Sequence, residues 1–394
     1  MLSLTVLFIE IQLCPMFKLR INTILWVPLF LTIISCEKNE GDGYRLLSKT
    51  PVSGGLVTDV WGFTQNNMEY AVIGTINNES PYGNITIFDI SDPAQPEKKS
   101  EFALKGFDIK YWNKHLYVSS GGTATTAIPG GIILDVTDPS MPEKVGEMPP
   151  SHNFFIDEYG YMYLAGGSIE IDSVTYGMPY LRIYDLNNDP AQPQEIFATD
   201  TATSHDVAVI NNYIYLFNAL LGTIIYHNTN PHSPEELSTL KLPEKTYDHS
   251  GWVTKDGNYL FICNELSPGY DTSKLKHEPV DDEWGGIDVY IWDISNKSNP
   301  VKVGEIDDQT SRVHNLYIID DLAYISYYDA GLKIYNVSKP TKPELIYQYD
   351  TNGESASQGY GRGFVGAFGV YPFTTSGNIL VSDTENGLMI FGLN

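Results

Sequence analysis

The sequence predicts an all-β fold in which seven four-stranded blades close into a β-propeller. Two observations carry this prediction. The first is a phrase that the chain repeats, an apolar strand that ends in Asp or Asn and runs into a turn containing prolines. The second is the four-strand pattern around each copy, with no sustained helical periodicity after residue 36. Repeats of about 40 to 50 residues with four strands each are typical of propeller blades.

The repeated phrase occurs five times, and a sixth copy is worn. The five copies occupy residues 85–96, 131–142, 181–193, 289–300 and 332–343. The worn copy, residues 222–234, has His227 and Asn228 where Asp is usual. Asp or Asn at a strand end can accept hydrogen bonds from the backbone that follows, and proline ends the ladder. We therefore interpret the repeated aspartates as turn residues rather than as catalytic groups.

The repeats divide the body of the chain into seven units. These units begin near residues 56, 106, 151, 203, 247, 311 and 363. The last unit runs out at Asn394 after three strands, and the stretch 44–51 ahead of the first unit can supply the missing outer strand. This closure would cover an open sheet edge, and it makes residues 44–394 a single propeller domain. Six or eight blades are the alternatives.

Composition and motifs restrict the possible functions. The formal net charge of -25 argues against nucleic acid as a partner. The three cysteines, Cys14, Cys36 and Cys263, offer no disulfide framework, and Cys263 lies in a strand-like run as a small buried residue. There is no GxSxG, HExxH, phosphate-binding loop or CxxC pair, so no motif indicates an enzyme. We expect a monomeric body.

Residues 1–36 have the pattern of a signal peptide. Met16 is the better initiator, since the basic Lys18 and Arg20 follow it, then an apolar run over residues 21–34, then Ser35 and Cys36. The sequence IISC resembles a bacterial lipobox, in which the Cys carries the lipid. The polar residues 37–43 would form a flexible tether. The alternative is an uncleaved signal anchor. Both interpretations place the body outside the cytoplasm, in the cell envelope, at the outer membrane or on the cell surface.

The first strands of the seven units align into two polar columns. The first column contains Thr58, Phe107, His152, His205, His249, His314 and Ala367, and the second contains Asp59, Asp108, Asn153, Asp206, Ser250, Asn315 and Phe368. Innermost strands surround the channel of a propeller, so equivalent positions form rings, and neighbouring columns should point to opposite faces of each blade.

These columns supply the candidate site. The candidate ligand-binding residues are Asp59, Asp108, His152, Asn153, His205, Asp206, His249, His314 and Asn315. The four histidines among them are candidate ligands for a divalent metal ion. The alternative is structural, because such side chains can hold neighbouring backbones by hydrogen bonds.

The longest connection, residues 267–286, and two tryptophans are further candidates. Acidic residues of the connection could hold a hard cation, namely Asp271, Glu278, Asp281, Asp282 and Glu283. Their spacing matches no EF-hand, so a mobile, solvated loop is the alternative. Trp252 and Trp284 could stack sugars or peptides, or could simply pack between sheets.

The strand phrases resemble the LVIVD repeat. The longer ordered set resembles the extracellular proteins of the choice-of-anchor B family, with DVWGF at Asp59, SHD at Ser204, HSGW at His249 and HNLY at His314. This resemblance spans nearly all of residues 56–394. It implies a β-propeller-like secreted or surface protein whose anchoring device varies between members, here the lipobox at Cys36. It implies no particular activity.

These features together favour a lipid-anchored, extracytoplasmic propeller that acts as a binding or scaffolding module for a protein, peptide or glycan. One alternative is a metal-dependent hydrolase or lyase that uses the His/Asp ring at one channel mouth. Another is a purely structural envelope protein.

Overall fold

The computed structural model describes most of the repeat body. The described residues are 43–77, 83–121, 123–124, 130–171, 174–200, 204–242, 246–265, 287–308, 311–351 and 365–393. The leader with Cys36, the tether residues 37–42, Trp284 and the acidic residues of the long connection lie outside them. Among the described residues, no helix has the length and apolar character needed to cross a membrane.

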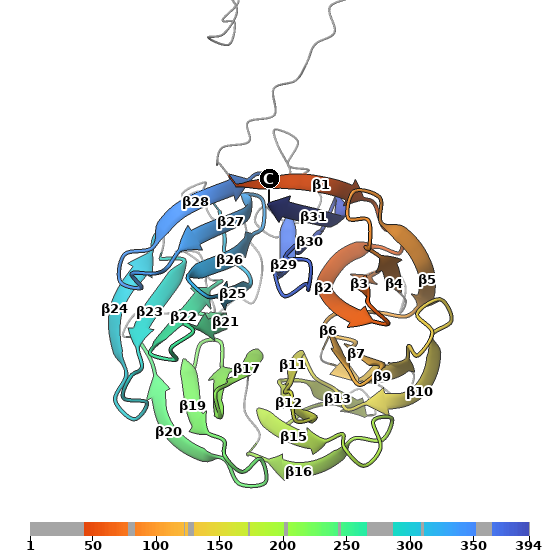
Figure 1. The fold of residues 1–394 in the computed structure, drawn as a ribbon. Coiled ribbons are helices and arrows are strands. Elements are labelled where there is room, and N and C mark those ends of the chain that lie inside the picture. Colours follow the sequence, from red (N-terminus) through yellow and green to blue (C-terminus); the bar gives the residue numbers. More distant parts are fainter. Residues whose placement is uncertain are drawn as a thin grey trace, which may run out of the picture. The chain divides into compact units, whose positions relative to one another are not determined.

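Seven four-stranded antiparallel sheets surround a common axis (Figure 1). Blade 1 contains β2 (Leu56–Gln65), β3 (Met68–Ile76), β4 (Asn84–Asp89) and β5 (Glu97–Ala103). Blade 2 contains β6 (Ile109–Trp112), β7 (His115–Ser119), β9 (Gly131–Asp135) and β10 (Glu143–Met148). Blade 3 contains β11 (Asn153–Ile156), β12 (Tyr161–Ala165), β15 (Leu181–Asp185) and β16 (Gln194–Ala198). Blade 4 contains β17 (Asp206–Ile210), β18 (Tyr213–Phe217), β19 (Thr223–His227) and β20 (Glu235–Leu240).

The remaining blades repeat the same antiparallel order. Blade 5 contains β21 (Asp248–Val253), β22 (Tyr259–Asn264), β23 (Val289–Asp293) and β24 (Val301–Ile306). Blade 6 contains β25 (Leu316–Ile319), β26 (Leu322–Tyr327), β27 (Gly331–Asn336) and β28 (Glu344–Tyr349). Blade 7 contains β29 (Ala367–Tyr371), β30 (Ile379–Asp383), β31 (Gly387–Leu393) and, from the other end of the repeat body, β1 (Tyr44–Thr50). The predicted all-β, seven-bladed fold is confirmed.

The ring closes through blade 7, as the sequence predicts. Strand β1 pairs antiparallel with β31, from Tyr44 opposite Leu393 to Thr50 opposite Leu388. Figure 1 shows β1 as the outer strand beside β31. Tyr44 also packs on blade 6, with its ring centre 5.4 Å from that of Tyr347. The edge of β31 is therefore covered.

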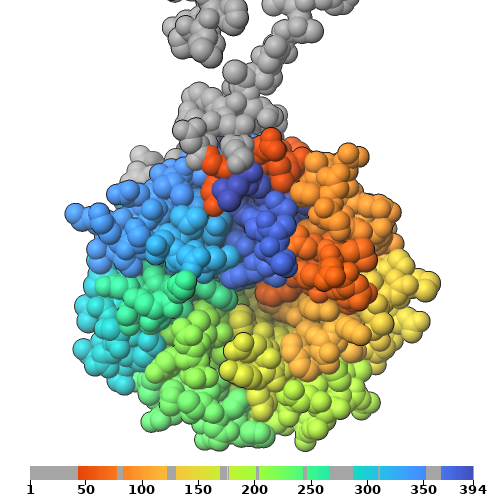
Figure 2. Space-filling model, viewed as in Figure 1, coloured from red at the N-terminus to blue at the C-terminus, as the bar shows by residue number. Residues whose placement is uncertain are grey.

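The hydrophobic core consists of seven clusters, one between each pair of neighbouring blades. Val72 of blade 1 and Leu116 of blade 2 share one cluster, and both are fully buried. Ile390 of blade 7 and Ile73 of blade 1 share the cluster that completes the ring. The space-filling view shows the blades in contact around the face in chain order (Figure 2). Each third strand is thus buried between two sheets, which is why the repeat phrases are mostly apolar on both faces, with Thr86, Arg182 and Lys333 as buried polar exceptions.

The repeated aspartates form the predicted turns. The first Oδ of each strand-end residue accepts a hydrogen bond from the backbone N–H two residues later, over 2.7–3.0 Å, at Asp89, Asp135, Asp185, Asp293 and Asn336. The same phrases contain a second turn of this kind, at Asp92, Asp138, Asp189 and Asn296. In the worn copy Asn230 forms this second turn, since it accepts from the His232 N–H over 3.2 Å. The worn copy therefore keeps the second of the two turns.

The two faces of the propeller are built differently. At one face, which we call the turn face, lie the links between first and second strands and the Asx turns between third and fourth strands. At the opposite face, which we call the entry face, the first strand of each blade begins. An additional three-stranded sheet lies at the entry face, formed by β8 (Thr123–Ala124), β13 (Ser168–Ile171) and β14 (Val174–Gly177). It joins insertions of blades 2 and 3, since β8 pairs with β13 in parallel.

Candidate functional site

Six aromatic side chains form a closed ring around the channel, near the entry face. The ring consists of Phe107, His152, His205, His249, His314 and Phe368, one from each of blades 2 to 7. Neighbouring ring centres lie 4.1–4.8 Å apart, and Phe107 and Phe368 close the circle at 6.2 Å. Blade 1 contributes no aromatic group to the ring, because this position is occupied by Thr58. The buried Thr58 hydroxyl donates to the Gly106 carbonyl over 2.6 Å. The four histidines of the predicted column therefore come together.

Blade 7 departs from the predicted alignment by one residue. The sequence places Ala367 in the histidine column and Phe368 in the next. In the structure Ala367 is fully buried in the core between blades 6 and 7, and Phe368 lies in the aromatic ring. The alignment was one residue off, because Phe368 lies inside the register shift between Ala367 and Gly369, just as His249 lies inside the shift between Asp248 and Ser250.

The expectation that the two columns point to opposite faces of each blade is also wrong. Residues of both columns line one cavity of about 220 Å³. His152 and His205 precede the strands β11 and β17, and a register shift follows Asp248 in β21. The alternation of an ideal strand does not apply at such positions.

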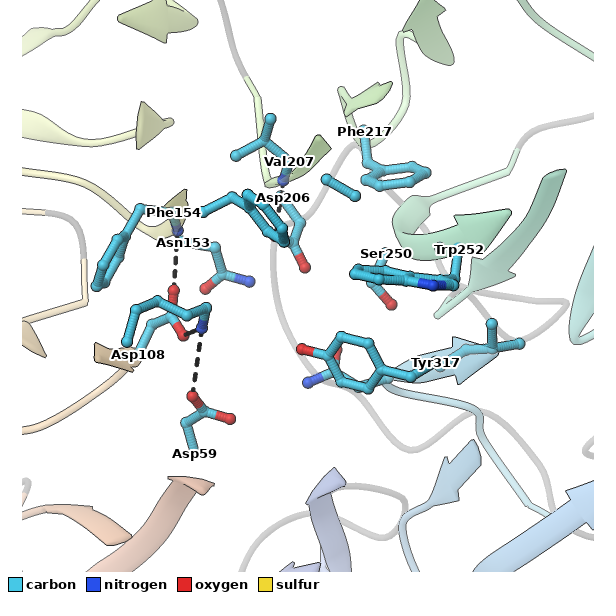
Figure 3. Close-up of a pocket in the computed structure, with 16 residues that line it drawn as sticks. Asp59, Asp108, Asn153, Phe154, Asp206, Val207, Phe217, Ser250, Trp252 and Tyr317 are labelled. Carbon is cyan, nitrogen blue, oxygen red and sulfur yellow. Dashed lines mark hydrogen bonds and ion pairs between the residues drawn. The ribbon is translucent and has the colours of Figure 1, made fainter. Parts of the chain in front are cut away.

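The structure places almost all of the predicted site residues around this cavity. Its lining includes Asp59, Asp108, His152, Asn153, His205, His249, His314 and Asn315. Asp206 lies farther along the channel, in an adjoining space of about 30 Å³ that Asp59, Asp108, Asn153 and Asn315 also line. Figure 3 shows Asp59, Asp108, Asn153, Asp206 and Ser250 arranged around this second space.

Lys110 is the cation that faces the carboxylates of Asp59 and Asp108. Its Nζ pairs with Asp108 Oδ1 and lies 3.6 Å from Asp59 Oδ2. Asp108 is also held by the Phe154 N–H, which donates to Oδ2 over 2.8 Å. Burial raises the pKa of Asp59 well above its usual value, against the opposing charge of Lys110. Burial, followed by the charge of Asp108, raises the pKa of Asp206 to about 7.

Aromatic side chains follow toward the turn face, two residues beyond the carboxylate positions. Trp252, a candidate from the sequence, has its ring centre 4.9 Å from Tyr317 and 5.7 Å from Phe373. Trp61 and Tyr371 form a similar pair at 4.7 Å, and Lys110 Nζ lies 4.5 Å from the centre of Trp61. Trp252 thus packs within an aromatic cluster at this end of the channel.

Burial keeps the ring histidines uncharged at neutral pH. Burial lowers the pKa of His314 to about 3, and it lowers the pKa of His152 as well. For His205 and His249, burial together with repulsion from the neighbouring histidines lowers the pKa well below its usual range. Neutral imidazoles carry one nitrogen lone pair each and can bind a metal ion or accept a hydrogen bond.

Hydrogen bonds from the histidines to the next blade are also present. His205 Nδ1 lies 3.2 Å from the His249 carbonyl oxygen, and His314 Nδ1 lies 2.5 Å from the Phe368 carbonyl oxygen. Because a carbonyl only accepts, Nδ1 is the donor in both pairs. The structural role considered for these histidines and their availability as ligands are therefore compatible, since the Nε2 lone pair stays unused by these bonds.

Glu265 and Tyr328 belong to the site, and the sequence analysis missed both. Glu265 directly follows β22, and its Oε2 lies 3.6 Å from His249 Nε2. The Tyr328 hydroxyl donates to Glu265 Oε1 over 2.6 Å. Burial raises the pKa of Glu265 to about 7. Both residues lie at the ends of second strands, and only a search of those ends could have found them.

The comparisons with known proteins agree with the fold. Three segments, residues 70–103, 280–308 and 312–351, match the family model of the LVIVD repeat. No curated protein matches the chain. A computationally designed protein, Ika8, aligns over 88% of this chain and 99% of its own, with a TM-score of 0.54 and 9% identity.

A second solved structure is the extracellular domain of a putative hybrid two-component system from B. thetaiotaomicron. It aligns over 89% of this chain and 39% of that chain, with a TM-score of 0.54 and 12% identity. At these identities both likenesses concern the fold alone. The finer resemblance to the choice-of-anchor B family stays a prediction. The chain is thus a seven-bladed β-propeller in which three segments match the LVIVD repeat.

Proposed function

We propose that the protein is a lipid-anchored, extracytoplasmic binding module that holds a protein, peptide or glycan partner at its entry face. The observation that carries this proposal is the contrast between the two faces. The turn face consists of short, regular turns, whereas the additional sheet β8–β13–β14 lies at the entry face. The cavity beneath the aromatic ring lies at the same end of the channel. In repeat proteins, insertions on one face often form the binding surface.

The location outside the cytoplasm rests on the signal-peptide pattern that ends at Cys36. The solved extracellular domain with a similar fold is consistent with it. The net charge of -25 supports a partner that is neutral or basic rather than a nucleic acid.

Photo-crosslinking from the two faces tests the binding proposal. One variant carries a photoreactive amino acid at Leu221, in the exposed β18–β19 link at the entry face. The matched control carries it at Tyr159, in the exposed β11–β12 turn at the turn face. A protein or peptide partner should crosslink from position 221 and not from position 159.

A glycan array, probed with the full chain and with a variant in which residues 168–177 are replaced by a short turn, covers the glycan alternative. Crosslinks from position 159 alone, or no binding in either assay, would contradict the proposal.

A metal-dependent hydrolase or lyase is the second candidate, and one observation favours it. His205, His249 and Glu265 form the two-histidine, one-carboxylate composition that catalytic zinc sites use while keeping one position for water or substrate. Turnover of an ester, phosphoester or glycan substrate that Glu265→Gln abolishes and His232→Gln leaves unchanged would support it. Unchanged turnover in the Glu265→Gln variant would reject the hydrolase or lyase function.

A further inference from the structure

We infer that His205, His249 and Glu265 form a binding site for one first-row transition metal ion, with zinc the best match. One ligand atom from each of the three side chains lies within 4.8 Å of the other two. Two imidazoles and a carboxylate are the donor set that zinc commonly takes, and calcium and magnesium prefer oxygen alone. This inference does not depend on which partner binds the entry face.

The spacing between His249 and Glu265 suits a shared ion better than a direct contact. His249 Nε2 and Glu265 Oε2 are 3.6 Å apart, which is too long for a hydrogen bond. Two ligands that are each about 2.1 Å from a tetrahedral zinc ion lie about 3.4 Å from one another. All pairs in the set lie within 4.8 Å, so reaching this spacing requires at most about 1.4 Å of closure between two ligand atoms.

Two of the three donors, His205 and Glu265, are held in the orientation that metal ligands need. His205 donates its Nδ1 proton to the His249 carbonyl oxygen, so its lone pair is at Nε2. Tyr328 donates to Oε1 of Glu265 and leaves Oε2 directed toward His249. Such outer hydrogen bonds fix the tautomer and the rotation of metal ligands.

His152 adjoins the three ligands. Its Nε2 lies 3.0 Å from His205 Nε2, so a proton on His152 can be donated to the His205 lone pair. A metal ion bound to His205 replaces this hydrogen bond. We therefore assign His152 to the fourth side of the site as a neighbour of the bound ion and not as one of its three ligands.

Titration of the metal-free full chain with Zn²⁺ tests the site, with the dissociation constant measured by calorimetry and the stoichiometry checked by metal analysis. We expect one ion per chain. Zn²⁺ should raise the thermal midpoint of unfolding, because it binds the native state. His205→Phe should abolish binding, whereas His152→Phe should keep it. The two substitutions are matched, since Phe107 and Phe368 already occupy equivalent positions in the ring.

Tyr328→Phe and Glu265→Gln separate ligation from orientation. Glu265→Gln removes a ligand charge and should weaken Zn²⁺ binding more than Tyr328→Phe does. Tyr328→Phe removes only the orienting hydrogen bond, and loss of such a bond typically weakens binding about 10- to 100-fold. His232→Gln, in an exposed turn, should bind as the wild type does.

The Co²⁺ absorption spectrum of the wild-type chain gives a readout that needs no variant. A four-coordinate site with nitrogen and oxygen ligands should give strong visible bands, which Zn²⁺ should remove. Absence of these bands, absence of Zn²⁺ binding, or equal binding by His205→Phe and His152→Phe would overturn the inference.

Discussion

Lys333 shows how a single charged residue is accommodated in the core of this protein. Its side chain is fully buried on β27, pairs with Asp308 Oδ2, and has its ammonium 4.4 Å from the centre of the Tyr327 ring. The carboxylate and the ring face compensate the buried charge. Asp288 lies close to this pair and is mostly buried, but its own surroundings favour the neutral acid.

Asp288→Asn should stabilise the protein at alkaline pH and change little at acidic pH. Burial raises the pKa of Asp288 to about 8, helped by the charges of Asp308 and Asp307 and opposed by Lys333 and by the hydrogen bond from the Asp308 N–H. The folded state therefore binds this proton more tightly than the unfolded state. Its contribution to stability is lost as pH rises from the unfolded pKa, near 4, through the folded pKa.

Denaturant unfolding at pH 5 and pH 9 measures this effect. At pH 9 we expect a gain for Asp288→Asn of more than about 1.4 kcal/mol, the equivalent of one pKa unit. Asp293→Asn, at the other end of β23, is the control. Hydrogen bonds from Ser295 lower the pKa of Asp293, so its loss should cost a similar free energy at both pH values. A pH-independent effect of Asp288→Asn would contradict the prediction.

The site was predictable at the residue level where it follows the repeat and unpredictable where it does not. Four histidines occupy equivalent positions in consecutive units, so alignment alone brings them together. Blade 7 has Phe368 instead of a histidine at this position, so its sequence did not mark the column and the alignment was placed one residue too early. Glu265 belongs to no column, and its approach to His249 depends on how β22 ends.

At the level of elements, the hairpins of the turn face are fixed by local backbone geometry. Three links between first and second strands consist of two residues that both have positive φ, namely Asn66–Asn67, Asn113–Lys114 and Asn211–Asn212. This conformation suits the right-handed twist of a hairpin, and Asn tolerates it better than other residues with a side chain. Lys114, with φ of 64°, is the exception in residue type.

Lys114→Gly should therefore stabilise the protein. The left-handed conformation costs a residue such as Lys about 1–2 kcal/mol, and glycine adopts it freely but loses about 0.5–1 kcal/mol more in entropy on folding. We expect a net gain of about 0.5–1 kcal/mol in the free energy of urea unfolding. Asn67→Gly is the matched substitution and should gain less. A loss of stability in Lys114→Gly would show that its side chain contributes more than the turn geometry costs.

The four-strand pattern of each blade was predictable, and the additional sheet was not. The phrases that become β4, β9, β15, β23 and β27 share an apolar run and a terminal Asp or Asn, so their structure follows from local sequence. The sheet of β8, β13 and β14 depends on insertions of two neighbouring blades meeting at the entry face. No local sequence pattern predicts that strands from these two insertions pair with each other.

At the level of the whole molecule, stability depends on ring closure. Every blade buries its two sheet faces against its neighbours, so each of the seven hydrophobic clusters needs two intact blades. Blade 7 is the one blade assembled from both ends of the repeat body. Its outer strand contributes Tyr44, which is buried against Tyr324 and Tyr347 of blade 6.

Replacing residues 44–50 with a Gly/Ser segment of equal length should lower the thermal midpoint and cause self-association. Loss of a buried large aromatic side chain alone costs about 3–5 kcal/mol. The unpaired edge of β31 would also offer its backbone to another chain. Calorimetry and sedimentation measure the two effects, and an added peptide with the sequence of residues 44–50 should partly reverse both. An unchanged midpoint in a monomeric variant would show that closure by β1 contributes little.

The pairing of β1 with β31 also sets the order in which the molecule can be completed. Tyr44 is opposite Leu393, near the two ends of the repeat body. A chain that emerges with its amino-terminal end first presents β1 long before β31, its partner in the sheet. Blades 1 to 6 can pack in succession as they appear, whereas blade 7 is complete only once β31 has emerged. Protection of the edges of blade 7 from proteases should therefore arrive late, when β31 pairs with β1.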